Sequence, residues 1–231
     1  MRVQKHIPVQ QAVENVRSGD TIMVGGFGLV GSPLTLIDAL THRDVTDLTI
    51  ISNNVGETGK GLGILLQQGK LKKAIGSYFT SNREVAQWYN EGKLELELLP
   101  QGTFAEAIRA GGAGIGGFYT KTAVGTELAA GKETREIEGE TYLLEKPLKA
   151  DVAFVRAEKA DTKGNLVYYK TARNFNPVMA SAASYVVAEV DDIVNEGELD
   201  PEAIATPHLF VDALVQSRYV LTKEGVVDRG R

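Results

Sequence analysis

The sequence of 231 residues contains no cysteine and only three histidines. Without cysteine the chain has no disulfide bond, no thiolate nucleophile and no thiolate metal ligand. The histidines are far apart and stand in unrelated contexts, so we expect no metal site; they are His6, His42 and His208. Glu57 and Glu106 are candidate nucleophiles, but neither stands alone in an apolar setting that would raise its reactivity.

A basic surplus and a long apolar run are also missing. The formal net charge is -5, which argues against a nucleic-acid-binding protein, because such proteins carry clustered Lys and Arg. No apolar segment approaches the length of a membrane span, and the N-terminus has no signal-like apolar core. With 43% hydrophobic and 24% charged residues, the composition is typical of a globular protein. We expect a soluble cytoplasmic protein that binds neither nucleic acid nor membrane.

The most informative segment is residues 24–33, VGGFGLVGSP. The apolar run 21–24 before it predicts a buried strand, and the spacing of apolar residues in 34–40 predicts a helix. Pro33 suits the first helical turn, and Ser32 is the expected N-cap. The glycines allow positive φ angles and close approach of a ligand to the backbone. Because free N–H groups at a helix start attract negative oxygens, we predict that this glycine turn binds a group that is, or becomes, negative.

The same glycines also match a dinucleotide-binding motif. Gly26, Gly28 and Gly31 have the spacing G-x-G-x-x-G between a strand and a helix. Such a site needs an acidic residue about twenty positions further on, at the end of the next strand. The next predicted strand, residues 48–51, ends in Ser-Asn-Asn, and Glu57 comes too late. An NAD-dependent dehydrogenase is therefore a disfavoured alternative.

Predicted strands and helices alternate along the chain. Strands are expected at residues 21–24, 48–51, 74–79, 94–99, 151–155, 166–169 and 185–188, and helices at 8–16, 34–40, 61–71, 83–91 and 103–110. This alternation predicts an α/β fold in which helices flank an open, mainly parallel, Rossmann-like sheet. A charged, β-like segment predicts a small β excursion near residues 115–150. No linker or repeat interrupts the chain, so we expect a single domain, residues 1–231.

Two further features follow residue 100. Thr103 and Glu106 have the spacing of a capping box at the start of a helix. Five of the residues in 111–117 are glycines, which predicts a flexible lid or a backbone surface that approaches a ligand.

Polar side chains, mostly amides, follow several predicted strands. They include Asn53 in 52–54, Gln101 in 100–103, and the asparagines of 171–177. The carboxyl ends of parallel strands share one edge of a sheet, where open α/β proteins bind ligands. Amide side chains do not exchange protons near neutral pH, but they hold carboxylates and stabilise oxyanions. Each amide could instead satisfy only its own turn; their recurrence at strand ends favours a binding site.

These segments together resemble one protein family. Residues 25–33, 52–54, 100–103, 109–114, 159–161, 164–166 and 171–176 resemble the A (α) subunit of family I coenzyme A transferases. The resemblance covers almost the whole chain. It departs from the family at Ser18 and Gly116, which lie outside the expected reactive groups.

The resemblance implies an enzyme made of two chains, A and B. It would move CoA from succinyl-CoA to a 3-oxo acid such as acetoacetate, or use acetate or another short acyl group. In this family a glutamate of the B subunit, in a Glu-Asn-Gly context, attacks the acyl-CoA and forms a mixed anhydride, then a glutamyl-CoA thioester. No Glu-Asn-Gly occurs here, which agrees with a chain without its own nucleophile. The CoA thioester is a substrate, and no permanently bound cofactor is expected.

The resemblance also implies residue roles. Gln101 and Asn53 correspond to active-site amides near the acyl group and the incoming carboxylate. The CoA-binding loop corresponds to Gly25, Gly26, Phe27, Gly28, Leu29, Val30 and Gly31.

Overall fold

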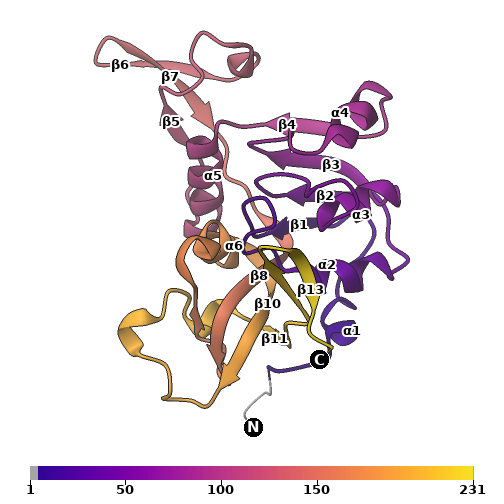
Figure 1. Cartoon of the computed structure of the whole chain (residues 1–231). Helices are drawn as coiled ribbons and strands as arrows, with labels where there is room; N and C mark the ends of the chain where they lie inside the picture. Colours follow the sequence, from indigo (N-terminus) through magenta and orange to yellow (C-terminus); the bar gives the residue numbers. More distant parts are fainter. Residues whose placement is uncertain (1–4, 231) are drawn as a thin grey trace.

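The computed structural model describes residues 5–230, and a large central sheet dominates it (Figure 1). Its strands are β1 (Thr21–Val24), β2 (Leu48–Ile51), β3 (Leu71–Gly76), β4 (Glu95–Leu98), β8 (Ala150–Asp161), β9 (Leu166–Val167), β10 (Ala183–Val194) and β11 (Ala213–Gln216). Their spatial order is β11-β10-β8-β1-β2-β3-β4, with β9 paired to β8. Only β9 pairs antiparallel within this sheet of the described chain. The predicted α/β fold with a mainly parallel sheet is confirmed.

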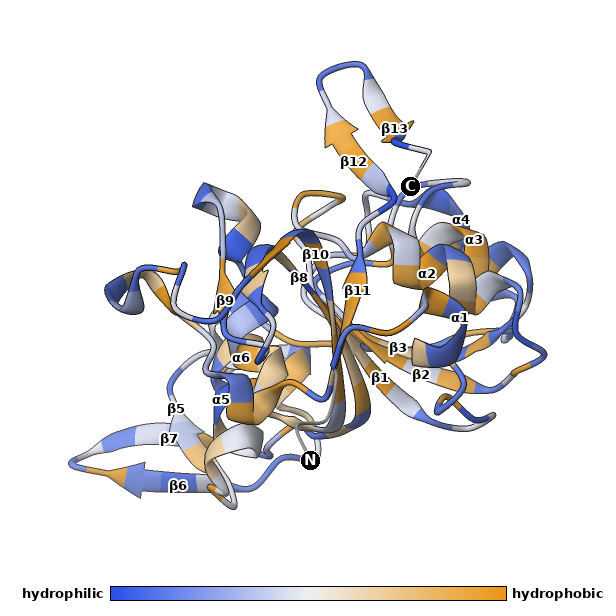
Figure 2. Cartoon of the chain, turned by 90° about the horizontal axis from the view of Figure 1, so that it is seen from below, coloured by the Kyte–Doolittle hydropathy of each residue, from blue (hydrophilic) through white to orange (hydrophobic). Residues whose placement is uncertain are grey.

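Helices cover both faces of the sheet (Figure 2). One side carries α1 (Val9–Ala12), α2 (Leu34–Thr41), α3 (Leu62–Gln67) and α4 (Arg83–Asn90), and the other carries α5 (Gln101–Ala113) and α6 (Asn176–Ala180). Neighbouring residues of β1 serve the two layers, because side chains alternate along a strand. Ile22 packs in the core with Leu36, whereas Met23 packs with Phe104 and Met179. No helix within residues 5–230 is long and apolar enough to cross a membrane.

Two small antiparallel sheets extend from this body (Figure 2). The first contains β5 (Phe118–Thr120), β6 (Thr134–Ile137) and β7 (Glu140–Glu145), in the order β5-β7-β6, and confirms the predicted excursion. The second is the C-terminal hairpin of β12 (Tyr219–Thr222) and β13 (Gly225–Asp228). Short 3-10 helices complete the fold at Glu127–Ala129 (η1), Lys170–Arg173 (η2), Pro201–Ala203 (η3) and His208–Phe210 (η4).

Several element bounds differ from the sequence-based expectation. The first helix is only Val9–Ala12, and β3 occupies Leu71–Gly76 rather than 74–79. Helix α5 begins at Gln101 after the N-cap Pro100, so the predicted capping box is wrong. Pro100 is extended, with a φ of -55° and a ψ of 139°, and it has no N–H group. The helix therefore begins directly after it, at Gln101.

The side chains of the expected capping box have other environments. Thr103 lies inside the helix, where its buried Oγ1 has no hydrogen-bond partner among the described residues. Glu106 pairs with Arg109 one turn further on, at 2.6 Å. The Arg109 guanidinium holds the pKa of Glu106 below its usual value.

Two of the glycines in 111–117, Gly111 and Gly112, serve helix packing. Helix α5 continues to Ala113 and ends at Gly114 in the left-handed conformation. A Cβ at Gly111 would lie 1.8 Å from the Leu148 carbonyl oxygen, and one at Gly112 would lie 2.4 Å from Ser181 Oγ. Gly111 and Gly112 therefore let α5 touch neighbouring chain segments directly, and the expected loop is helical at these two positions.

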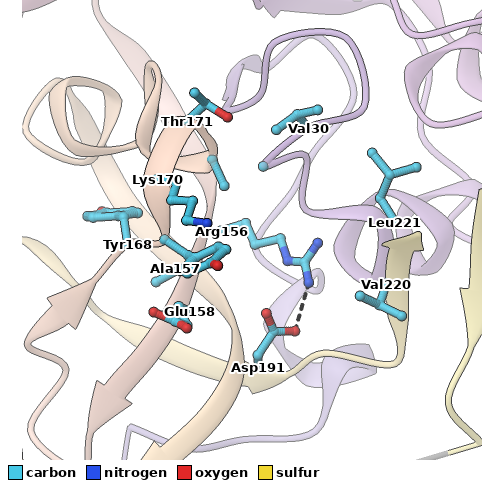
Figure 3. A pocket seen from close by; sticks show the side chains of 13 residues that line it. Val30, Arg156, Ala157, Glu158, Tyr168, Lys170, Thr171, Asp191, Val220 and Leu221 are labelled. Carbon is cyan, nitrogen blue, oxygen red and sulfur yellow. Dashed lines mark hydrogen bonds and ion pairs between the residues drawn. The ribbon is translucent and has the colours of Figure 1, made fainter. Parts of the chain in front are cut away.

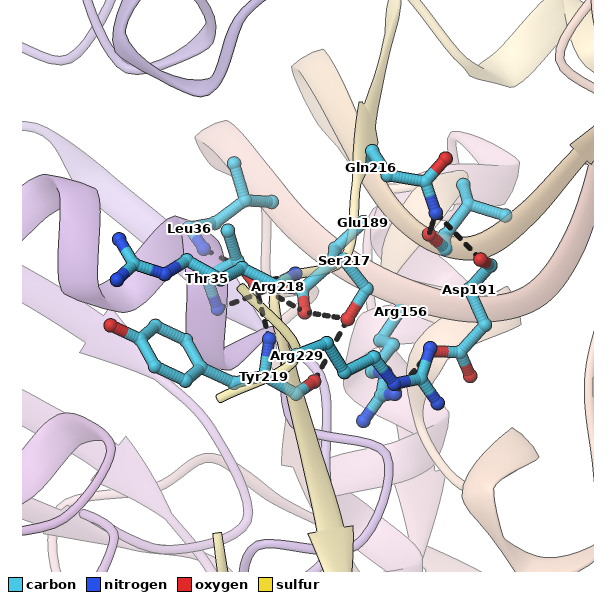
Figure 4. Close-up of polar contacts among 11 residues, drawn as sticks. Thr35, Leu36, Arg156, Glu189, Asp191, Gln216, Ser217, Arg218, Tyr219 and Arg229 are labelled. Atoms are coloured by element: carbon cyan, nitrogen blue, oxygen red, sulfur yellow. Dashed lines mark hydrogen bonds and ion pairs between the residues drawn. The ribbon is translucent and has the colours of Figure 1, made fainter. Parts of the chain in front are cut away.

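A buried carboxylate from a distant strand caps helix α2 (Figure 4). The N-cap is Pro33, which has no capping side chain, so the expected Ser32 cap is wrong. Thr35 and Leu36 donate their backbone N–H groups to Glu189 Oε2 at 2.8 and 3.3 Å. The hydroxyls of Thr35 and Ser217 donate to Oε1 at 2.9 and 2.8 Å. The positive end of the helix therefore binds a carboxylate of its own chain.

The environment of Glu189 sets a pH dependence for folding. Its side chain is completely buried, and this burial raises its pKa, although Arg156 and the surrounding donors act in the opposite direction. In the unfolded chain a glutamate titrates at about 4.3. A carboxyl group with a higher pKa in the folded chain contributes stability that is complete below the unfolded pKa. That contribution is lost as the pH rises through the folded pKa.

We predict that Glu189→Gln removes this dependence, because an amide does not titrate. Relative to wild type, the variant's free energy of unfolding should increase from about pH 4.5 to about pH 7.5. Urea unfolding at a series of pH values measures the difference. A difference that stays constant, or moves in favour of wild type, would show that the donors keep Glu189 ionised throughout.

Candidate functional site

The glycine turn lies where the strand order of the sheet reverses. The chain places β2, β3 and β4 on one side of β1, and β8, β10 and β11 on the other. Open α/β sheets bind ligands at the carboxyl ends of their strands at such a switch point. The turn leaves β1 at this point, and Gly25 donates its N–H to the Phe154 carbonyl of β8 at 2.9 Å. The topology therefore places residues 25–31 where a ligand crevice is expected.

The tip of the turn is a closed two-residue hairpin. Phe27 N–H donates to the Val30 carbonyl at 3.0 Å, and Val30 N–H donates to the Phe27 carbonyl at 3.2 Å. Gly28, at the tip, has a φ of 60°, a conformation that costs glycine little. Phe27 and Val30 are 49% and 40% exposed. The turn therefore presents two apolar side chains to solvent on a fixed backbone.

The backbone N–H groups of the turn fall into two sets. One set donates to other atoms of the chain: Gly25, Gly26, Phe27 and Val30. Within residues 5–230 the other set donates no hydrogen bond: Gly28, Leu29 and Gly31. The first N–H groups of helix α2 are bound by Glu189, so the expectation of free donors at the helix start is wrong. Donors for a ligand oxygen therefore come from the turn itself.

Asn53 and Gln101 meet at the same edge of the sheet. Ser52 Oγ donates to the Val24 carbonyl at 2.8 Å and joins the end of β2 to the start of the turn. Asn53, which is 1% exposed, donates through Nδ2 to Ser77 Oγ at 2.9 Å and to Gln101 Oε1 at 3.5 Å. The structure thus brings together two amides that are 48 positions apart in the sequence.

The two amides differ in how many of their polar atoms are hydrogen-bonded. Asn54 donates to Asn53 Oδ1 at 3.0 Å, so both ends of the Asn53 amide are engaged. Gln101 is exposed. Its Oε1 accepts from Asn53, and its Nε2 donates no hydrogen bond to residues 5–230. Gln101 can therefore donate to an oxygen that develops negative charge, with Asn53 as its fixed neighbour.

A cleft of about 420 Å³ borders the other side of the turn (Figure 3). Val30 and Gly31 form one wall, and Val220 and Leu221 of the C-terminal hairpin form another. Arg156 lies inside, paired with Asp191 at 2.7 Å, and the same carboxylate oxygen also pairs with Arg229 at 3.1 Å. The sequence singled out the glycine turn and residues 171–177, which both contribute to this cleft, but not the hairpin wall opposite them, which comes from a distant segment.

Neither candidate carboxylate provides a nucleophile at this edge. Glu57 pairs with Lys60 at 3.3 Å and Glu106 with Arg109 at 2.6 Å, and the side chains of both glutamates are well exposed. A reactive carboxylate is usually desolvated and free of such partners. Among the described residues, no group of three or more Asp, Glu or His side chains could hold a metal ion.

Comparison with known proteins defines the class. The profile of the Coenzyme A transferase family matches residues 7–217. The A subunit of a probable succinyl-CoA:3-ketoacid coenzyme A transferase of Bacillus subtilis is 50% identical over 89% of this chain and 87% of its own length. The A subunit of the 3-oxoadipate CoA-transferase of Pseudomonas putida is 51% identical over 90% of each chain.

A solved structure shows the same fold. The acyl-CoA transferase of Escherichia coli O157:H7, in a thioester complex with CoA, matches with a TM-score of 0.82 at 23% identity. The match covers 93% of this chain and 47% of that longer chain. The chain described here belongs to the coenzyme A transferase family. The resemblance seen in the sequence is confirmed, and the nicotinamide alternative loses its support.

We predict that alanine has unequal effects at two glycines of the turn. A Cβ at Gly25 would lie 1.8 Å from Asn176 Oδ1, whereas one at Gly28 meets nothing within 4 Å. Gly28→Ala should cost only the left-handed backbone, about 1–2 kcal/mol, or a few degrees in Tm at about 2–4 °C per kcal/mol. Gly25→Ala should lower Tm at least about twice as much, because a buried amide must move. Equal losses in thermal unfolding would contradict the tight contact at Gly25.

Proposed function

We propose that this chain is the A subunit of a two-chain CoA transferase that moves CoA from succinyl-CoA to a 3-oxo acid such as acetoacetate. The observation that carries the proposal is the Nε2 of Gln101, which donates no hydrogen bond within residues 5–230 and lies beside the buried Asn53, at a strand edge where the described residues offer no nucleophile. The names of the relatives at 50% and 51% identity support the substrate class and the role as one of two chains.

The proposed reaction divides the chemistry between the chains. A glutamate carboxylate of the B chain attacks the thioester carbonyl of succinyl-CoA, and negative charge develops on the carbonyl oxygen. Collapse expels the CoA thiolate and leaves a glutamyl-succinyl anhydride. The thiolate then attacks the glutamyl carbonyl and releases succinate, which leaves a glutamyl-CoA thioester. The carboxylate of acetoacetate reverses the same steps and leaves as acetoacetyl-CoA.

The A chain stabilises these steps through hydrogen bonds and forms no covalent bond to the substrate. Gln101 Nε2 donates to the oxygen that becomes negative, an interaction stronger in the transition state than in the ground state. The free N–H groups of Gly28 and Leu29, beside the exposed Phe27 and Val30, bind the acyl-CoA. With acetoacetate as acceptor, the enzyme belongs to ketone-body metabolism. We propose that it acts in the cytoplasm as a heterodimer or heterotetramer of A and B chains.

We predict that the purified A chain transfers no CoA and gains activity with its B partner, because it offers no activated nucleophile. The assay combines A and B with acetoacetate and compares succinyl-CoA with acetyl-CoA as donor. A higher kcat/KM for succinyl-CoA supports the proposed donor. A preference for acetyl-CoA would select the acetate or short-chain alternative, and full turnover by A alone would refute the division between chains.

We predict that Gln101→Ala, assembled with the B chain, lowers kcat at least about tenfold, which equals about 1.4 kcal/mol. Tm should stay near that of wild type, because the side chain is exposed. Gln87→Ala is the matched control, since Gln87 is also a helical glutamine with a side-chain hydrogen bond, at 3.0 Å to Glu91. Normal turnover with a lowered Tm would assign Gln101 to structure alone.

A further inference from the structure

We propose that Asn174 and Asn176 are positioning residues that hold the glycine turn in the shape that binds acyl-CoA. The binding role of the turn rests on the proposed function, whereas the contacts of the two asparagines stand by themselves. Asn174 follows η2 and Asn176 is the first residue of α6. Asn174 lies 148 positions from Gly26 in the sequence. The sequence places both among the strand-end amides of a candidate binding site, but it does not indicate which backbone groups they hold.

Asn174 bridges the two limbs of the turn with one side chain. Its Oδ1 accepts the N–H of Gly26 on the incoming limb at 3.0 Å. Its Nδ2 donates to the carbonyl of Val30 on the outgoing limb, also at 3.0 Å. These two bonds fix the separation of the limbs, and the hairpin bonds between Phe27 and Val30 close the tip beyond them.

Asn176 anchors the end of the turn to the sheet. It is fully buried, and its Nδ2 donates to the Gly31 carbonyl at 3.0 Å. Its Oδ1 accepts the N–H of Arg156 on β8 at 2.8 Å. One amide thus ties the turn after β1 to the neighbouring strand β8. The same amide fills the space that a Cβ at Gly25 would need.

The backbone of Asn174 is strained. Its φ of 24° and ψ of -122° lie in a region that costs a non-glycine residue on the order of 1–3 kcal/mol. Glycine would adopt this conformation without that cost. A non-glycine side chain at a strained position therefore indicates that the side chain itself has a role, and here its amide joins both limbs of the turn.

We call the two hydrogen bonds of Asn174 to the turn the clamp. The clamp engages the N–H of Gly26 and leaves the N–H groups of Gly28 and Leu29 without partners in the described chain. A turn that is already fixed loses less conformational freedom when a ligand binds. Loosening it should weaken acyl-CoA binding and leave the bonds of the chemical step in place. The expected effect is a raised KM for acyl-CoA with kcat nearly unchanged, the opposite of the effect expected for Gln101.

The test uses the assembled A and B chains with three substitutions of Asn174. Asn174→Ala removes the clamp, and Asn174→Gly removes it while relieving the backbone strain. Asn174→Asp keeps the acceptor for Gly26 but loses the donor to Val30. All three should raise KM for succinyl-CoA at least about fivefold, with kcat within about twofold of wild type. Asn195→Ala is the control, because Asn195 is an exposed asparagine bonded to Glu198 at 2.9 Å.

Hydrogen exchange on the same complexes separates this proposal from the proposed function. Peptides covering residues 25–31 should exchange at least about tenfold faster in the Asn174 variants, with other regions and the Asn195 control unchanged. Wild-type KM in Asn174→Gly, or unchanged protection of residues 25–31, would overturn the clamp. If the wild-type complex transfers no CoA, the proposed function fails. The exchange measurement still shows whether Asn174 holds the turn.

Discussion

The buried carboxylate of Glu189 holds the architecture around the glycine turn. It receives two backbone N–H groups from the first turn of α2 and a hydroxyl from Ser217, so it joins a helix, strand β10 and the connection after β11. Thr35 extends the same network, because its Oγ1 accepts the N–H of Arg218 at 2.9 Å. A fully buried carboxylate would be strongly destabilising without such donors. The helix after the turn therefore has a fixed position.

This arrangement changes what the glycine turn can bind. In many strand-turn-helix motifs the helix start receives the anion of the ligand. Here an internal carboxylate occupies that position, and Asn174 and Asn176 bind part of the turn backbone. The remaining donors are few and lie in the turn itself. A small number of fixed donors suits a carbonyl oxygen or a carboxylate better than a pyrophosphate, which needs several N–H groups.

The chemistry of the site follows from amides at strand ends. Asn53 is held by Ser77 and Asn54, and Gln101 stands beside it with an Nε2 that donates no hydrogen bond within residues 5–230. In the proposed function these amides stabilise charge, but they cannot exchange protons or form an acyl bond near neutral pH. Within the coenzyme A transferase family, a site of amides that form no acyl bond is consistent with a nucleophile on a second chain. The apolar tip of the turn, Phe27 and Val30, is exposed at the same switch point of the sheet.

The sequence by itself determined the elements whose signal is local. The apolar runs of β1 and β2 predicted Thr21–Val24 and Leu48–Ile51 with their correct bounds. The cap of α4 is also local, because Asn82 lies next to the helix in the sequence and accepts the N–H of Glu84. The ordered motifs of glycines and amides also identified the family, and strand-end positions indicated that Asn53 and Gln101 share one edge. All of these inferences use residues close in the chain or the alternation of elements.

Only the tertiary structure decided which partners satisfy the backbone. The cap of α2 comes from Glu189, 154 positions beyond Thr35, and the clamp of the turn comes from Asn174, 148 positions beyond Gly26. Local rules placed a cap at Ser32 and a capping box at Thr103, because they consider only neighbours in sequence. The glycines of α5 likewise acquired their role from contacts with Leu148 and Ser181. Buried donors bind whichever acceptor the folded chain brings to them, and that choice depends on the packing of the whole sheet.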